Sequence, residues 1–324
     1  MIISADFSNE DGENTVTLND REAALVQLLS HLAADGYEFV TPTPATHEIN
    51  MERRRGQTAR TTRDVLGWSM KFRSGEIDPV VERLLYAAGA LAGESNGRHS
   101  TIRVSTLDSK LFVHSAFPTS SADAVFFGPD SYRFADLIRA ELALVGGSPV
   151  IVDVGTGAGV GAIVAGTIVP VATIVMTDIN SSAIALAQVN AWTAGVPVAA
   201  YCGDLFASYE GSVDIALANP PYIIDPAGRL YRDGGSLHGA ELSIRMAREV
   251  LPRLNPRGRF ILYSGSAIVD GLNALEERLA VVASENDCSF EYREIDPDVF
   301  GEELTSSDYE QVERIAAIAA VFRR

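Results

Sequence analysis

From about residue 133 onward, short apolar runs alternate with stretches of helical spacing. The apolar runs predict strands over residues 149–154, 174–177, 198–202, 213–218 and 259–263. Strands that alternate with helices in this way form a parallel sheet with both faces covered. Two more apolar runs follow near the C-terminus, 289–295 and 314–322, and indicate an antiparallel edge. We therefore predict an α/β fold around a mostly parallel sheet.

The first 115 residues have a different pattern. Helical spacing with capping residues and glycine stops predicts helices over 19–36 and 78–93. Two strand-like runs, 102–107 and 111–117, are joined by three polar residues and predict a hairpin. We expect a smaller N-terminal α+β domain, residues 1–115, that recognises the substrate, followed by a larger domain over residues 116–324.

Composition and charge narrow the function classes. The chain has 324 residues, of which 47% are hydrophobic, so it can bury a sizeable core and is not a disordered chain. Its 26 basic and 43 acidic residues give a formal net charge of -17, which disfavours a nucleic-acid partner. Its two cysteines, Cys202 and Cys288, form no zinc-binding or disulfide pattern. We expect a cytoplasmic protein without a metal site.

Two segments need a separate interpretation. The uncharged stretch from Val154 to Thr177 is long enough to cross a membrane, but its glycines and Pro170 argue against one continuous helix. We expect a loop, a helix of small residues and a buried strand there, with no membrane contact. The acidic N-terminal segment, residues 1–14, has neither the basic start nor the apolar run of an export signal.

An arginine-rich stretch lies between the two N-terminal helices. It contains Arg53, Arg54, Arg55, Arg60, Arg63 and, further on, Lys71 and Arg73. One interpretation is a solvated face, or a set of ion pairs to the acidic remainder of the chain. The other interpretation is a docking surface for an acidic partner or substrate.

The strand that ends at Val154 runs into a turn with glycine at alternate positions. Gly155, Gly157 and Gly159 remove side chains where backbone N–H groups and a helix N-terminus can approach a ligand. The spacing is tighter than the dinucleotide-binding G-x-G-x-x-G pattern, although Ala162 completes a looser G-x-G-x-x-A frame, so a dehydrogenase stays open. Asp153 precedes the turn and offers a carboxylate to an ammonium group, which S-adenosylmethionine has and a nicotinamide lacks.

Acidic residues also end the next two strands. Asp178 can accept hydrogen bonds from a ribose diol, and Asp204 can reach an adenine amino group. Each residue alone is more often a cap or a surface acid. Because they end successive strands, they lie at the same crevice edge of the sheet.

The fourth strand ends in Asn219-Pro220-Pro221-Tyr222. The prolines stiffen the turn, so the Asn219 side-chain oxygen and the Pro220 carbonyl can be fixed acceptors for one NH₂ group. Tyr222 offers an aromatic face for a planar amide or base. The tetrapeptide therefore predicts a site for a nitrogen-bearing substrate.

These motifs, in this order and spacing, resemble a class I S-adenosylmethionine-dependent methyltransferase of the HemK/PrmC group, which methylates the glutamine amide of release factors. The resemblance covers about residue 125 to the end, including Gly128 to Tyr132. It implies a Rossmann-like sheet, S-adenosylmethionine as cofactor and Asn219 and Pro220 gripping the substrate nitrogen. The cofactor-binding residues that it implies are Asp153, Gly155, Thr156, Gly157, Gly159, Asp178, Ile179, Asp204, Leu205 and Asn219.

Three functions remain open at this point. The first is an N-methyltransferase that acts on a protein glutamine or on a small amide- or amine-bearing molecule. The second is a base methyltransferase of RNA or DNA, and the third is a cofactor-binding protein without catalysis. His238, in the loop after the tetrapeptide, is a candidate proton acceptor, although a lone histidine is more often structural. The sequence does not predict the oligomeric state.

Overall fold

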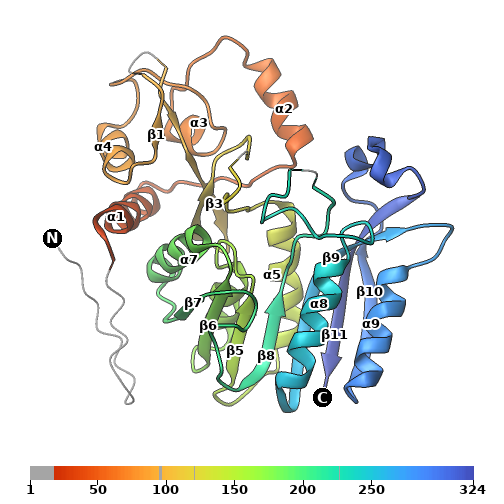
Figure 1. Ribbon diagram of the computed structural model, residues 1–324. Helices are drawn as coiled ribbons and strands as arrows, with labels where there is room; N and C mark the ends of the chain where they lie inside the picture. The colour runs from red at the N-terminus through yellow and green to blue at the C-terminus, as the bar shows by residue number, and fades with distance from the viewer. Residues whose placement is uncertain (1–17, 95–96, 120, 226) are drawn as a thin grey trace.

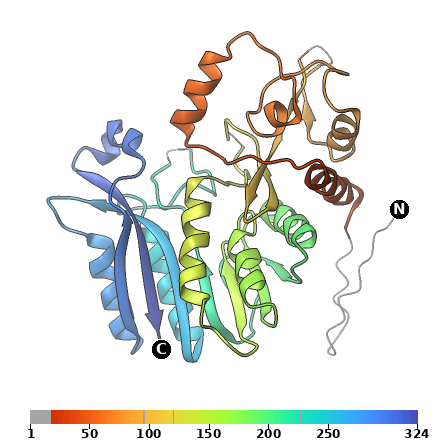
Figure 2. The ribbon, with the colours of Figure 1, turned by 180° about the vertical axis from the view of Figure 1, so that it is seen from behind.

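A computed structural model of the chain describes residues 18–324 apart from residues 95–96, 120 and 226. The acidic segment in which the sequence shows no export signal lies outside the described residues. The N-terminal elements, red to yellow in Figures 1 and 2, lie over the end of a central sheet at which strand β8 terminates.

In the described part of the chain, the central sheet has seven strands in the order β10-β11-β9-β8-β5-β6-β7. The five adjacent strands β9, β8, β5, β6 and β7 pair with one another in parallel. Strand β11 is antiparallel to both of its neighbours, β9 and β10. The mostly parallel α/β fold is thereby confirmed, with the antiparallel strand one place in from the edge. The strands are β5 (Val150–Val154), β6 (Thr173–Asp178), β7 (Ala199–Cys202), β8 (Val213–Ala218), β9 (Leu254–Ile268), β10 (Ser289–Asp296) and β11 (Arg314–Arg323).

Helices cover both faces of this sheet, so successive strand residues are buried on opposite sides. Ile151 of β5 packs beneath α5, α6 and α7, and Val152 packs beneath α8 and α9. The helices are α5 (Pro129–Leu142), α6 (Val160–Ile168), α7 (Ser181–Ala194), α8 (Glu241–Val250) and α9 (Ala274–Glu285), with short 3₁₀ turns at Leu251–Arg253, Gly301–Thr305 and Ser307–Tyr309. This two-sided burial explains why the strands read as continuous apolar runs.

The strand order reverses next to β5. From β5 the chain moves outward through β6 and β7, and then returns to place β8 on the other side of β5. The connections that follow β5 and β8 therefore diverge and leave a crevice at the carboxyl ends of these strands, where open α/β sheets bind ligands.

Strand β9 is longer than the sequence predicts. It runs from Leu254 to Ile268 and exceeds the expected 259–263 at both ends. At its start Leu254 pairs with Val213 of β8, and at its end β11 pairs with it as far as the Ile268–Arg314 register. Near this end the residue is Gly265, where a β-carbon would lie 2.0 Å from the ring of Tyr222. The long-range contact, not local propensity, sets the end of this strand.

From residue 18 onward, without residues 95–96, the N-terminal part contains four helices and two small sheets: α1 (Asp20–Ala34), α2 (Pro44–Arg53), α3 (Thr62–Leu66), α4 (Pro79–Ala87), the pair β1 (Leu91–Ala92) and β2 (His99–Ser100), and the hairpin β3 (Ile102–Leu107) and β4 (Lys110–Ser115). The hairpin and the start of α1 match the prediction. The expected end of the second helix at Gly93 is wrong, because the helix stops at Ala87 and Gly89 follows with a φ of +65°. The sequence interpretation also missed α2 and α3.

The arginine-rich stretch forms its ion pairs locally. Arg54 pairs with Asp64, Arg55 with Glu52 and Arg73 with Glu76. The expected ion pairs to the acidic remainder of the chain are therefore wrong for these three arginines, because α2 and α3 bring acids of the same stretch beside them. Arg53, Arg60, Arg63 and Lys71 are exposed, as the solvated-face interpretation predicts.

The uncharged stretch around residues 154–177 forms a loop, α6 and β6, as its glycines predict. Within the described part of the chain, no helix combines the length and the apolar character that a membrane crossing needs.

A buried asparagine joins the N-terminal hairpin to the sheet domain. Asn190 of α7 is fully buried, and its amide accepts a hydrogen bond from the Val113 N–H at 2.8 Å and donates to the Val113 carbonyl at 3.0 Å. The same NH₂ group donates to the Ala158 carbonyl in the glycine turn at 2.9 Å. One side chain thus holds β4, α7 and the glycine turn together.

Replacing this amide with an apolar group of similar size leaves three backbone groups without a partner. For Asn190→Leu we expect the free energy of unfolding to fall by about 3 kcal/mol, since each unsatisfied buried polar group costs about 1–3 kcal/mol. The control is Asn50→Leu, whose amide makes one exposed hydrogen bond on α2, and we expect a change within about 0.5 kcal/mol. Urea unfolding measures both, and equal losses would contradict the joining role of Asn190.

Candidate functional site

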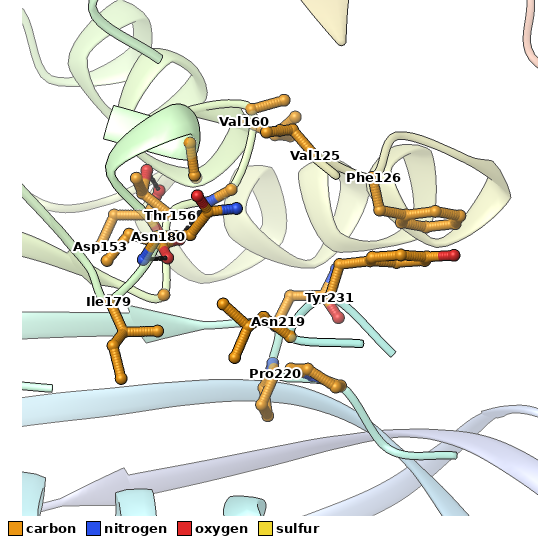
Figure 3. Close-up of a pocket in the computed structure, with 18 of the residues that line it drawn as sticks. Val125, Phe126, Asp153, Thr156, Val160, Ile179, Asn180, Asn219, Pro220 and Tyr231 are labelled. Carbon is orange, nitrogen blue, oxygen red and sulfur yellow. Dashed lines mark hydrogen bonds between the residues drawn. The ribbon is translucent and has the colours of Figure 1, made fainter. Parts of the chain in front are cut away.

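A cavity opens in the crevice between the ends of β5 and β8 (Figure 3). Most of the residues expected to bind the cofactor line it: Asp153, Gly155, Thr156, Gly157, Asp178, Ile179, Asp204, Leu205 and Asn219. The cavity also contacts Pro220. Residues from four strand ends, far apart in the sequence, therefore meet around one space.

The glycine turn needs its glycines for backbone reasons. Gly155, Gly157 and Gly159 have φ values of +71°, +55° and +84°, a region that side chains disfavour. Gly159 does not line the cavity. It begins α6, and a β-carbon there would lie 3.2 Å from that of Ala187 on α7, so it permits close helix packing.

Asp153 is buried beneath this turn and organises it. Its Oδ2 accepts hydrogen bonds from the Thr156 hydroxyl at 2.6 Å and from the Ala162 N–H at 2.9 Å. Gly161 has no side chain because a β-carbon would lie 2.5 Å from the Asp153 Oδ1. Burial raises the pKa of Asp153 to about 6, and none of the described cationic side chains forms an ion pair with it.

Asp178 holds the turn from the neighbouring strand. Its carboxylate accepts hydrogen bonds from the Gly157 N–H at 2.9 Å and from the Asn180 N–H at 2.8 Å. Burial raises the pKa of this carboxyl group above its usual value. A carboxylate has about four acceptor positions, so Asp178 keeps the capacity to bind a ligand hydroxyl.

Asp204, which follows β7, also lines the cavity. Its side chain is 46% exposed and forms an ion pair with Arg245 of α8. A ligand that binds Asp204 would share this carboxylate with Arg245.

Asn219 and Pro220 face the cavity directly after β8. Figure 3 shows both on the wall across from Asp153 and Thr156. The Asn219 side chain makes no hydrogen bond with the residues that the structure describes, although it is only partly exposed. Asn219 and Pro220 also line a second, adjoining cavity, together with Tyr222 and Phe300.

Tyr222 is held by a buried carboxylate. Its hydroxyl donates to Oδ2 of Asp130 at 2.7 Å, and the Tyr263 hydroxyl donates to Oδ1 at 2.8 Å. Arg133 also lies 3.3 Å from this carboxylate. Burial raises the pKa of Asp130, while both tyrosines and Arg133 oppose that rise. Asp130 thus ties the tetrapeptide to β9 and to the N-terminus of α5.

Two aromatic side chains that the sequence interpretation missed lie beside Asn219. The rings of Phe126 and Tyr231 are nearly parallel, with an interplanar angle of 8° and centroids 6.2 Å apart (Figure 3). Both residues come from irregular segments, and no local pattern distinguishes them from other loop aromatics. Only the fold brings them together.

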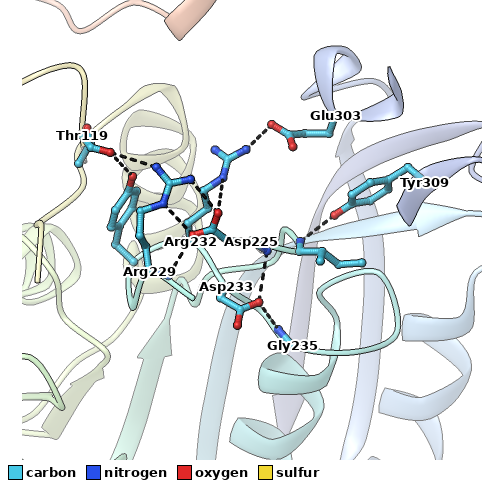
Figure 4. Close-up of polar contacts among 10 residues, drawn as sticks. Thr119, Asp225, Arg229, Arg232, Asp233, Gly235, Glu303 and Tyr309 are labelled. Carbon is cyan, nitrogen blue, oxygen red and sulfur yellow. Dashed lines mark hydrogen bonds and ion pairs between the residues drawn. The ribbon is translucent and has the colours of Figure 1, made fainter. Parts of the chain in front are cut away.

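The loop after the tetrapeptide is fixed by ion pairs (Figure 4). Asp225 accepts hydrogen bonds at 2.7 Å from Nε and Nη2 of Arg229, which lowers the pKa of Asp225 to about 2. Arg229 and Tyr231 both donate to the Thr119 carbonyl, at 3.1 and 2.8 Å. Arg232 pairs with Glu303 on the far side. These contacts fix the position of the Tyr231 ring beside the cavity.

His238, the candidate proton acceptor, is placed elsewhere. It is not among the described residues that line the two adjoining cavities, and its ring packs against Tyr309 at 5.9 Å.

A family model, the methyltransferase small domain, matches residues 140–231. This range contains the glycine turn, Asp178, Asp204 and the tetrapeptide, and with them most of the residues that line the cavity.

Curated relatives match over longer stretches of the chain than the family model does. The chain is 30% identical over 189 residues to the release factor glutamine methyltransferase of Deinococcus radiodurans, covering 57% of this chain and 66% of that protein. It is 32% identical over 146 residues to the methyltransferase HEMK2 of Mus musculus, covering 41% of this chain and 67% of that protein. The chain thus spans about two thirds of the length of these relatives.

Among solved structures, TYW2 of M. jannaschii in complex with AdoMet matches with a TM-score of 0.48 and 15% identity, covering 72% of this chain and 89% of that one.

Removing the hydrogen bond from the Tyr222 hydroxyl to the buried Asp130 carboxylate should lower the stability of the fold measurably. For Tyr222→Phe we expect the free energy of unfolding to fall by about 1.5–3 kcal/mol, because hydrogen bonds to charged groups are the strong ones. The control is Tyr37→Phe, whose buried hydroxyl donates to the neutral Val104 carbonyl and should cost about 0.5–1.5 kcal/mol. Chemical denaturation compares the two, and a smaller loss in Tyr222→Phe would contradict the role of Asp130.

Proposed function

The chain belongs to the HemK family of S-adenosylmethionine-dependent methyltransferases, and we propose that it methylates an amide or amine nitrogen, with the side-chain amide of a protein glutamine as its acceptor. The observation that carries this proposal is the single cavity that joins the glycine turn and Asp178 to Asn219 and Pro220. A methyl donor and a nitrogen acceptor can therefore be bound side by side.

The residues of the cavity fit the cofactor. Nothing lies within 4 Å of the position that a β-carbon on Gly157 would occupy, so a ligand can approach the backbone there. Asp153 is a buried carboxylate without a cationic partner among the described residues, which suits the ammonium group of the methionine part. Asp178 would accept from the ribose hydroxyls, with Ile179 beside it, and Asp204 and Leu205 would lie on the adenine side. When bound, S-adenosylmethionine supplies an electrophilic sulfonium methyl group.

Asn219 and Pro220 would orient the acceptor nitrogen. The Asn219 Oδ1 and the Pro220 carbonyl oxygen would accept the two hydrogens of an NH₂ group and so fix the direction of its nitrogen. Both oxygens would also stabilise the positive charge that develops on nitrogen as its bond to the methyl group forms and the bond between methyl and sulfur breaks. The methylated nitrogen would then lose one of its two hydrogens as a proton to water. Holding two reactants in line can lower a barrier by about 7–11 kcal/mol. The planar amide can lie against the ring of Tyr231, Phe126 or Tyr222.

The N-terminal part is proposed to recognise the acceptor, since it lies over the end of the sheet at which the cavity opens (Figure 1). A nucleic-acid acceptor is not favoured, because the net charge is -17 and three cations of the arginine-rich stretch are paired locally. A cytoplasmic location remains part of this proposal.

The two halves of the cavity can be separated by mutation. We expect Asn219→Ala to lower methyl transfer by about 10²–10³-fold, the usual effect of losing one group that stabilises a transition state, while cofactor affinity stays within a few fold. Asp178→Ala should weaken cofactor binding instead. Calorimetry with the donor and its demethylated product gives the affinities, and transfer of a labelled methyl group to glutamine-containing peptides gives the activity. Equal loss of both properties in Asn219→Ala would contradict this division.

Asp153 predicts a pH dependence of cofactor binding. Its pKa of about 6 means that the carboxyl is largely protonated at pH 5 and charged at pH 7. An ammonium group binds the charged form, so affinity for S-adenosylmethionine should rise with pH up to about 6, by at most tenfold per unit.

The same pKa fixes the sign of a stability effect. Because the unfolded carboxyl titrates near 3.9, the folded state holds its proton more tightly, and the contribution of Asp153 to stability falls as pH rises from about 4 to 6.

The control for the binding prediction is Asp153→Asn. Its affinity for S-adenosylmethionine should change less with pH than that of the wild type and should be lower than that of the wild type at pH 7. Wild-type affinity that does not change between pH 5 and 7 would contradict the assignment of Asp153 to the ammonium group.

A further inference from the structure

A third cavity lies between the N-terminal part and the sheet domain. It is bordered by the segment that leads into α2, by the hairpin β3–β4 and by the segment that leads into α5. Its rim includes the partly exposed Thr119, and its interior includes three buried basic side chains, His47, Arg103 and His114. None of the described residues that line it is acidic.

Arg103 is a buried cation with an unused donor. Its residue is 3% exposed, and its Nε donates to the Gly67 carbonyl at 2.8 Å. Its Nη2 is buried and has no hydrogen-bond partner. The guanidinium carbon also lies 5.2 Å from the centre of the Phe39 ring. Burial lowers the pKa of Arg103 to about 10, which leaves it charged at neutral pH.

His47 provides a second unused atom in the same cavity. It is 4% exposed, its Nδ1 has no hydrogen-bond partner, and its ring packs against Phe117 at 4.6 Å. Burial and the nearby Arg103 lower the pKa of His47 to about 4, so the ring is neutral at pH 7 and carries one N–H. The pKa of His114 is lowered for the same reasons. The interior therefore holds one positive charge and no described negative charge.

A buried charge without a counter-ion is unfavourable unless a ligand supplies the opposite charge. A carboxylate fits this environment, because a guanidinium and a carboxylate are both planar and bind through charge-assisted hydrogen bonds. We propose that Arg103 and His47 form a carboxylate-binding site in which Nη2 of Arg103 and the Nδ1–H of His47 donate to the ligand. The ligand is a side-chain carboxylate of the protein that carries the accepting glutamine, which rests on the function proposed above.

The position of Phe126 connects this site to the acceptor. Phe126 lines the carboxylate cavity, the cofactor cavity and the cavity beside Tyr222. When the glutamine amide of a peptide lies at Asn219, the peptide contacts one side of the Phe126 ring. A neighbouring acidic residue of the same peptide can then reach the carboxylate cavity on the other side of this ring. The site would thereby select glutamines that have an acidic residue close by.

The anion site can be tested without methyl transfer. Formate and acetate are titrated into the full chain at constant ionic strength, with chloride as the balancing salt, and thermal unfolding is followed. We expect a saturable rise in Tm for the wild type and none for Arg103→Met. The matched control, Arg63→Met, removes an exposed arginine that lies over the same Phe39 ring and should respond like the wild type. No saturable response in the wild type, or an equal response in Arg103→Met, would overturn the site.

A second variant covers the case in which Arg103→Met does not fold. His47→Phe keeps an aromatic ring against Phe117 but removes the Nδ1 donor. We expect it to weaken formate binding by about 10-fold, within the range for one hydrogen bond to a charged group. Unchanged affinity in His47→Phe would remove His47 from the site.

The link to the acceptor is tested with paired peptides. Each contains one glutamine, flanked by glutamate in one peptide and by methionine, an uncharged side chain of similar length that is not an amide, in the other. For the wild type we expect a KM about 10-fold lower for the acidic peptide at similar kcat, and for Arg103→Met we expect equal KM values. Equal KM values in the wild type would overturn the assignment to the acceptor. Formate binding without methylation of any peptide would leave the anion site standing and contradict the proposed function.

Discussion

The reversal of strand order beside β5 determines where the candidate site of this molecule lies. Because β6 and β7 extend one way and β8 returns on the other side, the turns that follow β5 and β8 separate and cannot pack on each other. A glycine turn, with no side chain at alternate positions, and a proline-stiffened turn whose asparagine has no hydrogen-bond partner among the described residues border the space between them. Both features are local in the sequence, but they form a site only because the sheet sets them on opposite walls.

The parts of this site that follow directly on strands could be predicted from the sequence. Asp153, Asp178 and Asn219 each stand at the end of an apolar run, so recognising the run fixes the end of the strand and hence the edge at which the residue lies. Asp130, Phe126 and Tyr231 could not be predicted in this way. Their positions depend on long-range contacts, such as those of Asp130 with Tyr222 and Tyr263, and no local period encodes them. The unexpected length of β9 has the same origin.

Buried charged side chains without an oppositely charged partner indicate which parts of the fold bind ligands. Asp130 is compensated by two tyrosine hydroxyls and by Arg133, so its burial gives a well-fixed contact. Asp153 and Arg103 lack an oppositely charged partner among the described residues, and both line cavities. An apolar residue at either position would avoid the desolvation cost. The simplest physical reason to keep an acid in one cavity and a base in the other is that ligands of opposite charge enter them.

Hydrogen bonds of Asn190 connect the walls of the cofactor cavity and the carboxylate cavity. Its amide bonds to Val113 on β4, in the part of the chain that holds the carboxylate cavity, and to Ala158 in the glycine turn. A displacement of the hairpin therefore strains either the hydrogen bonds of Val113 or the bond to Ala158. Since the Ala158 carbonyl lies between two glycines with positive φ, the turn has little side-chain packing of its own to resist such a displacement. Occupancy of the N-terminal cavity would in this way bear on the geometry of the cofactor turn through a single buried amide, without any contact between the two ligands.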